Sequence, residues 1–153
     1  MSQLTFSTDP REAAKTLLAG LPQRRMRDVI EKRFGLKGGK PKTLQAIGGE
    51  YKITRERVRQ IEADALKHLM LPVSSDPMVP LVKAFEEHLL MHRGVIGEAR
   101  LLGDAGAAKL HPHILFLLNI MPLFTRLPET ESLSARWAMS QEHGRRLEEM
   151  LGR

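Results

Sequence analysis

The sequence predicts a mainly α-helical fold in two parts, a helix-turn-helix domain followed by a winged-helix domain, and three observations favour it. First, apolar residues recur at helical spacing through most of the 153-residue chain, between capping residues and glycine or proline stops. Second, residues 43–70 read as a short helix, a tight turn and a longer helix. Third, three helical segments in the second half precede two apolar segments with a polar tip between them, which is the order of a winged helix.

Four helices are expected in the first half, each with a polar cap or a proline at its start. They are a helix after Asp9 that ends at Gly20, a helix that opens at Pro22 and ends at Gly35, a short helix capped by Thr43 with a turn over residues 50–53, and a helix from Arg55 to about Met70 capped by Thr54. At 100° per residue the last helix has one apolar stripe, formed by Val58, Ile61, Ala65 and Leu69. Its other side carries guanidinium and amide donors, as a DNA recognition helix does.

The second half is predicted to follow a linker over residues 73–79, where serine and proline cluster. We therefore expect a helix-turn-helix domain over residues 1–72, a winged-helix-like domain over 80–139 and a C-terminal helix over 140–153. The predicted elements after the first domain are a helix from Asp76 to about His92, a short strand at Val95 and Ile96, a brief helix over 98–102, an apolar helix from Pro112 to Met121, and a hairpin of residues 123–127 and 133–139.

The charge of the chain is local. Residues 21–70 carry thirteen Lys and Arg against six Asp and Glu, a net charge of +7, whereas the other residues together carry −1. A compact basic segment suits a polyanion, because neutralising phosphates releases counterions. The composition, with 42% apolar and 27% charged residues and no long apolar run, predicts a cytoplasmic protein without a membrane partner.

No catalytic constellation is evident, so we expect neither an enzyme nor a small-molecule substrate, and no cofactor. The absence of cysteine excludes disulfides, thiolate metal sites and a cysteine nucleophile. His88 and His92 share a helix face and could hold a metal together with His111 and His113. Histidines on amphipathic helices more often lie at the edge of a core, and we therefore expect no metal site.

The run from Thr54 to Ala63 is similar to the recognition helix of region 4 in sigma-70-type factors of bacterial RNA polymerase. Asp64 stands where that family usually has lysine or arginine, and Gly49 stands where it has a better helix former. Nothing in the sequence resembles the sigma regions that melt DNA or grip the polymerase core, so we do not expect a complete sigma factor. The upstream segments that resemble the preceding helices of region 4 are residues 18–22, 33–36 and 43–48.

The resemblance implies that Arg55, Glu56 and Gln60 contact bases in the major groove of a minus-35 element. Arginine can donate two hydrogen bonds to guanine, glutamate can accept one from cytosine, and glutamine can pair with adenine or contact thymine. It further implies that Phe34 contacts the flap of the polymerase beta subunit. Phosphate contacts, which position a protein without reading sequence, are implied at Arg24, Arg33, Thr43, Leu44 through its backbone amide, Arg57 and Arg59.

The second half, from about Asp76 to Met139, is similar to the winged-helix domain of the RNA polymerase delta subunit, the HARE type. Together the two resemblances imply a sequence-specific, double-stranded DNA-binding transcription regulator that reads a minus-35-like site near the bacterial nucleoid. Two alternatives stay open: an adaptor that binds the polymerase flap or a sigma-binding factor without reading DNA, and a DNA-processing subunit that needs an enzyme partner. A homodimer through the final helix is also open, because one recognition helix covers one half-site.

Overall fold

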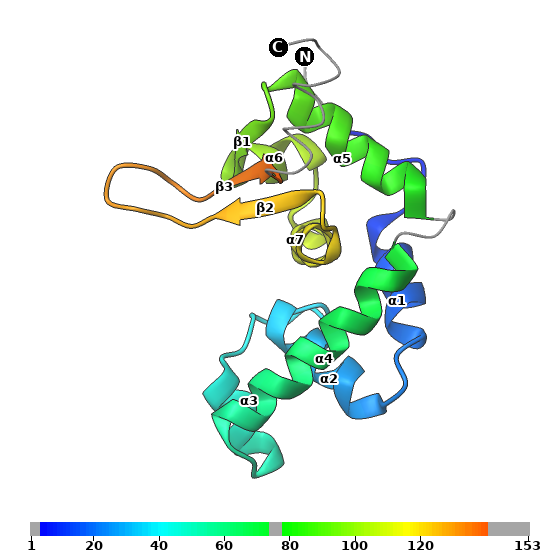
Figure 1. Cartoon of the computed structure of the whole chain (residues 1–153), viewed down its shortest axis with the longest axis vertical. Helices are drawn as coiled ribbons and strands as arrows, with labels where there is room; N and C mark the ends of the chain where they lie inside the picture. The colour runs from blue at the N-terminus through cyan, green and yellow to red at the C-terminus, as the bar shows by residue number, and fades with distance from the viewer. Residues whose placement is uncertain (1–3, 74–77, 141–153) are drawn as a thin grey trace.

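The computed structural model describes residues 4–73 and 78–140, and within them the predicted fold class is confirmed: the chain is mainly helical, with one small antiparallel sheet at one side of its second half (Figure 1). None of the helices in these residues is both long and apolar enough to cross a membrane. The predicted helix after Ser140 lies outside the described residues. The elements are α1 (Pro10–Ala19), α2 (Arg24–Phe34), α3 (Leu44–Tyr51), α4 (Arg55–Val73), α5 (Val79–Met91), β1 (Val95–Gly97), α6 (Glu98–Ala105), the 3-10 helix η2 (Ala108–Leu110), α7 (His111–Ile120), β2 (Phe124–Leu127) and β3 (Arg136–Met139).

Helix α2 begins two residues later than predicted, at Arg24 instead of Pro22. The amide of Leu21 still donates to the carbonyl of Leu18 at the end of α1, over 3.2 Å, so Pro22 lies in the connection between the two helices. The end of α2 is where the sequence places it, at Gly35, which adopts the left-handed conformation with φ of 65°.

The turn between α3 and α4 depends on a close approach of two backbone segments. The amide of Ile53 donates to the carbonyl of Gly48 over 3.0 Å, and Lys52 takes the left-handed conformation that ends α3. A Cβ atom at Gly48 would lie 2.7 Å from the carbonyl oxygen of Ile53, closer than van der Waals contact allows. Both predicted caps are confirmed: the hydroxyl of Thr43 accepts from Ala46 and that of Thr54 from Arg57, each over 3.1 Å.

Helix α4 extends one turn past Met70 and runs through Pro72 to Val73. Pro72 therefore lies within the last turn of the helix. Only residues 74–78 separate this helix from α5, fewer than the predicted linker of residues 73–79, and Asp76 and Pro77 lie outside the described residues. The predicted apolar stripe is confirmed, because Val58, Ile61, Ala65 and Leu69 are all buried.

The second half has the winged-helix order of helix, strand, helix, helix and hairpin. Strand β3 lies in the middle of the sheet, antiparallel to β1 on one side and β2 on the other, so Trp137 is opposite both Ile96 and Arg126. The hairpin projects from the helices in Figure 1. Helix α5 starts later than predicted, at Val79, and α6 is longer than predicted and continues to Ala105.

One hydrophobic core runs through both halves. The rings of Phe34 in α2 and Phe116 in α7 pack edge to face with centroids 5.4 Å apart. Phe6, ahead of α1, packs in the same way on Phe85 in α5, at 5.3 Å. The two halves therefore share a packed boundary, and their division into independent domains stays a prediction.

The carboxylate of Glu98 joins α6 to the sheet. It accepts hydrogen bonds from Nε and Nη2 of Arg126, over 2.9 and 3.1 Å, and from the indole of Trp137 over 3.0 Å. The hydrogen bonds from the Arg126 guanidinium and, to a smaller extent, from the Trp137 indole hold the pKa of Glu98 below its ordinary value. Trp137 is almost fully buried, so its N–H depends on this acceptor.

We predict opposite effects of alanine at two adjacent glycines. Gly48→Ala forces the α3–α4 turn apart and should destabilise the protein by about 1–3 kcal/mol. A Cβ atom at Gly49, inside a helix, would meet none of the described atoms within 4 Å. Gly49→Ala should therefore stabilise the protein by about 0.5–1 kcal/mol, because alanine has the higher helix propensity. Urea unfolding of both variants checks this, and effects of the same sign would contradict the packing described for Gly48.

We predict that Glu98→Ala lowers the free energy of unfolding at pH 7 by about 1–3 kcal/mol, because the buried indole N–H loses its acceptor. Glu98→Gln keeps an acceptor but loses the charge. The pKa of Glu98 is lower in the folded protein than in the unfolded chain. The contribution of its charge to the free energy of unfolding is therefore complete above about pH 4.3 and is lost as the pH falls through the folded pKa. The gap between wild type and Glu98→Gln should therefore narrow between pH 7 and pH 3 in urea unfolding. Glu87→Gln, at an exposed position, is the control and should show no such convergence.

Candidate nucleic-acid interface

The start of α4 presents the three predicted base-contacting residues together. Arg55, Glu56 and Gln60 are all exposed, while Val58 on the opposite side of the same turns is fully buried. At 100° per residue the three exposed positions span about 140° of the helix surface. This end of α4 lies beside α3 and away from the sheet (Figure 1), so the described part of the second half does not cover it.

Glu56 is paired with Arg59 one turn along the same helix. Its two carboxylate oxygens accept from Nε of Arg59 over 2.9 and 3.1 Å and from Nη2 over 2.6 Å. These bonds lower the pKa of Glu56 and raise that of Arg59. Glu56 is consequently ionised at neutral pH and can only accept hydrogen bonds, as contact with a cytosine amino group requires.

Arg57 and Gln60 are also linked. The backbone amide of Arg57 donates to the hydroxyl of Thr54. Nη1 of the Arg57 side chain donates to Oε1 of Gln60 over 3.3 Å. The carbonyl of the Gln60 amide is thus the acceptor within the protein, which leaves the nitrogen end as the donor toward a ligand.

Arg33, a predicted phosphate contact, is engaged within the protein. Its Nε donates to the carboxylate of Glu62 in α4, and its Nη1 donates to the carbonyl of Lys42 over 3.0 Å. Two of its donor groups are therefore used to hold α2, the following loop and α4 together. Its observed contacts hold α4 in place, and its contact with phosphate stays a prediction.

The remaining predicted phosphate contacts lie at two helix starts. Arg24 is the exposed first residue of α2. Thr43 caps α3, and Leu44 is its first residue, with its backbone amide in the first turn. Amides of a first turn have no carbonyl partner within the helix and point along its axis, so they can donate to a phosphate oxygen.

A cluster of basic groups around α3 was not predicted residue by residue. Glu50 accepts from Lys32 over 2.8 Å and also pairs with Lys42, and these two contacts lower its pKa from 4.5 to about 2. Arg25 and Lys32 lie over the ring of Tyr51, at 5.0 and 4.8 Å from its centroid. The local charge excess was the available signal for these residues, but their partners are distant in sequence.

Phe34 and the histidines singled out in the sequence lie outside the exposed start of α4. Phe34, the implied flap contact, is partly buried against Phe116 of α7. His88 and His92 lie beside Asp104 of α6, while His111 bonds the carbonyl of Gly106 over 3.1 Å. The group that the structure assembles is therefore two histidines with an aspartate, and not the set of four histidines considered from the sequence.

Comparison with known proteins covers the segment that carries this interface. Residues 17–70 match the family model described as sigma-70, region 4. Over 54 residues the chain is 48% identical to RNA polymerase sigma factor SigA of Lactococcus lactis subsp. cremoris, a match that covers 35% of this chain and 15% of that protein. Over 62 residues it is 48% identical to RNA polymerase sigma factor SigA of Nostoc sp., covering 40% of this chain and 16% of that one, and to SigA1 of Synechococcus elongatus, covering 40% and 15%.

The chain thus spans about 15% of the length of the curated relatives that it matches. All residues predicted to contact DNA, from Arg24 to Gln60, fall inside the matched segment. Residues 17–70 are accordingly a helix-turn-helix segment of sigma-70 region 4 type, homologous to sigma factors over that length.

Proposed function

We propose that this chain is a sequence-specific, double-stranded DNA-binding transcription regulator that inserts the start of α4 into a major groove. One observation carries the proposal: Arg55, Glu56 and Gln60 are exposed together at a capped helix start, within a segment of sigma-70 region 4 type. Their donor and acceptor chemistry suits guanine, cytosine and adenine or thymine respectively. The expected target resembles the minus-35 element.

The charge distribution supports binding to a duplex. The net charge of +7 is carried by residues 21–70, which fall within the matched segment. Arg57 lies on α4, the helix that carries the base-contacting groups, and Arg24 is the first residue of α2. Phosphate contacts from such residues supply affinity that falls as salt rises. We propose that these arginines position α4 without contributing to sequence preference.

The relatives are named as RNA polymerase sigma factors, and we propose that this chain shares their promoter-contact segment in the bacterial cytoplasm. Because it spans about 15% of their length, the proposal does not extend to the activity of a whole sigma factor. The winged-helix order of the second half supports a place in the transcription machinery, and we propose that it resembles the delta-subunit type in contacting protein or DNA.

The alternative function is an adaptor that binds the polymerase flap through the apolar side of α2. The edge-to-face contact of Phe34 with Phe116 favours DNA binding over this alternative, because that ring is already packed within the chain. An adaptor of this kind would have to displace α7 from α2.

We predict that Arg55→Ala relaxes the sequence preference of the protein. In selection of bound duplexes from a random pool, wild type should enrich a motif resembling TTGACA, and the variant should lose preference at one or two positions, equivalent to about 1–3 kcal/mol. Lys83→Ala, which removes an exposed charge from α5, is the control and should keep the motif. Binding by wild type that is blind to sequence, or absent, would contradict the proposal and favour the adaptor.

We predict a different result for Arg24→Ala. Because Arg24 is expected to contact phosphate, the variant should bind every duplex more weakly by a similar factor, with its motif unchanged. The slope of log K against log salt concentration should become shallower by about one. Fluorescence anisotropy on the selected duplex and on a scrambled duplex, from low to high salt, measures both quantities. A change in motif without a change in slope would contradict a phosphate contact.

A further inference from the structure

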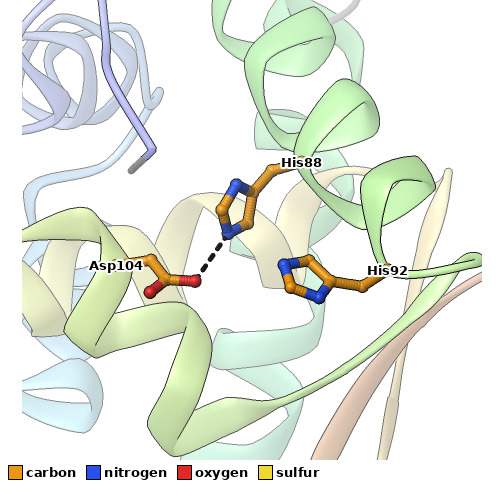
Figure 2. A group of neighbouring side chains, drawn as sticks. All are labelled: His88, His92 and Asp104. Atoms are coloured by element: carbon orange, nitrogen blue, oxygen red, sulfur yellow. Dashed lines mark hydrogen bonds and ion pairs between the residues drawn. The ribbon is translucent and has the colours of Figure 1, made fainter. Parts of the chain in front are cut away.

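Three side chains with metal-ligand chemistry meet in the second half, outside the proposed DNA interface. His88 and His92 are one helical turn apart near the end of α5, and Asp104 lies near the end of α6 (Figure 2). Their ligand atoms all lie within 4.8 Å of one another, and Nε2 of His88 is 3.0 Å from Oδ2 of Asp104. His88 is almost fully buried, and His92 and Asp104 are partly buried, so the group lies at the edge of the core.

The His92 imidazole has an unused nitrogen in this group. Its Nε2 is buried and has no hydrogen-bond partner among residues 4–73 and 78–140, although Figure 2 shows the ring turned toward His88 and Asp104. A buried polar atom without a partner costs free energy, so such an atom in a folded protein calls for an explanation. A ligand held between the three side chains would supply the missing partner.

We propose that His88, His92 and Asp104 form a binding site for a divalent transition metal, with Zn²⁺ the best fit. Two imidazole nitrogens and one carboxylate oxygen are a common three-ligand set for zinc, with water at the fourth position. Hard cations such as Ca²⁺ and Mg²⁺ prefer oxygen ligands and fit this set poorly. The site rests on these side chains alone and is independent of the proposed DNA-binding function.

The distances fit such an ion after a small movement. Zinc bonds of about 2.0–2.2 Å in tetrahedral geometry place ligand atoms about 3.3 Å apart. The nitrogen of His88 and the oxygen of Asp104 already lie 3.0 Å apart. The ligand atom of His92 lies within 4.8 Å of the other two, so completing the set requires its side chain to move closer.

The charge around the site is compatible with a cation. Nε of Arg100 lies 3.6 Å from the same carboxylate oxygen of Asp104, so it competes with a metal for that atom. The Arg100 side chain is 60% exposed and lies on the solvent side, where it can turn toward water when a metal binds. Two neutral imidazoles and one carboxylate then face the ion directly.

A bound metal would tie α5 to α6. The amide of Leu4, near the N-terminal end of the described residues, already donates a hydrogen bond to the backbone carbonyl of Asp104 over 3.0 Å. Metal binding should therefore stabilise the second half together with the N-terminal segment that packs on it.

The test is titration of the tag-free full chain with Co²⁺, which reports coordination by its visible absorption, followed by displacement with Zn²⁺. Wild type should bind one ion with the intense spectrum of a four-coordinate site, and Zn²⁺ should raise its Tm. His92→Ala should weaken binding by more than about 10- to 100-fold, the loss caused even by outer-shell changes, and abolish the rise in Tm. His68→Ala, at an exposed position in α4, is the matched control and should behave as wild type.

Two results would overturn the proposal: wild type that binds no stoichiometric Co²⁺, and His92→Ala that binds it as tightly as wild type. Nε2 of His92 has no hydrogen-bond partner among the described residues, so His92→Ala breaks no hydrogen bond of this atom there and should keep the metal-free circular dichroism of wild type. Asp104→Asn serves as a second variant, because asparagine retains an oxygen acceptor for His88 while losing the charge that holds a metal. Undiminished metal affinity in Asp104→Asn would also count against the site.

Discussion

The burial of one side of α4 is the constraint on which the rest of the first half depends. Val58, Ile61 and Ala65 are buried on the side of α4 that packs on the other helices, chiefly α2 and α3, so the helix cannot rotate without exposing them to water. The exposure of Arg55 and Gln60 is the other consequence of the same packing. The close approach at Gly48 sets where the helix begins, since the α3–α4 turn admits no side chain there.

Features that depend on neighbours in sequence were predictable. The caps at Thr43 and Thr54, the stop at Gly35 and the apolar stripe of α4 each follow from residues within one or two turns. The hairpin and its short partner strand follow from alternation and a polar tip. The helix limits were less predictable: α2 begins after Pro22, α4 runs past Pro72, α5 begins at Val79 and α6 continues to Ala105.

Contacts between distant residues were not predictable from periodicity. Arg33 is 29 residues from Glu62, Glu98 is 39 residues from Trp137, and Asp104 is 16 residues from His88, and no local spacing rule links these pairs. In each case the sequence shows a plausible residue type, but only the fold supplies its partner. For the DNA interface this means that exposure at the start of α4 was predictable, whereas the internal engagement of Arg33 was not.

Helix α7 connects the two halves more closely than a linker would. It packs on α1, α2 and α4 of the first half and also supplies core side chains to the second, with Phe116 meeting Phe34 across the boundary. Helix α7 therefore belongs to the core of both halves. The same packing explains why an apolar face of α2 that could serve a partner is covered by the chain itself.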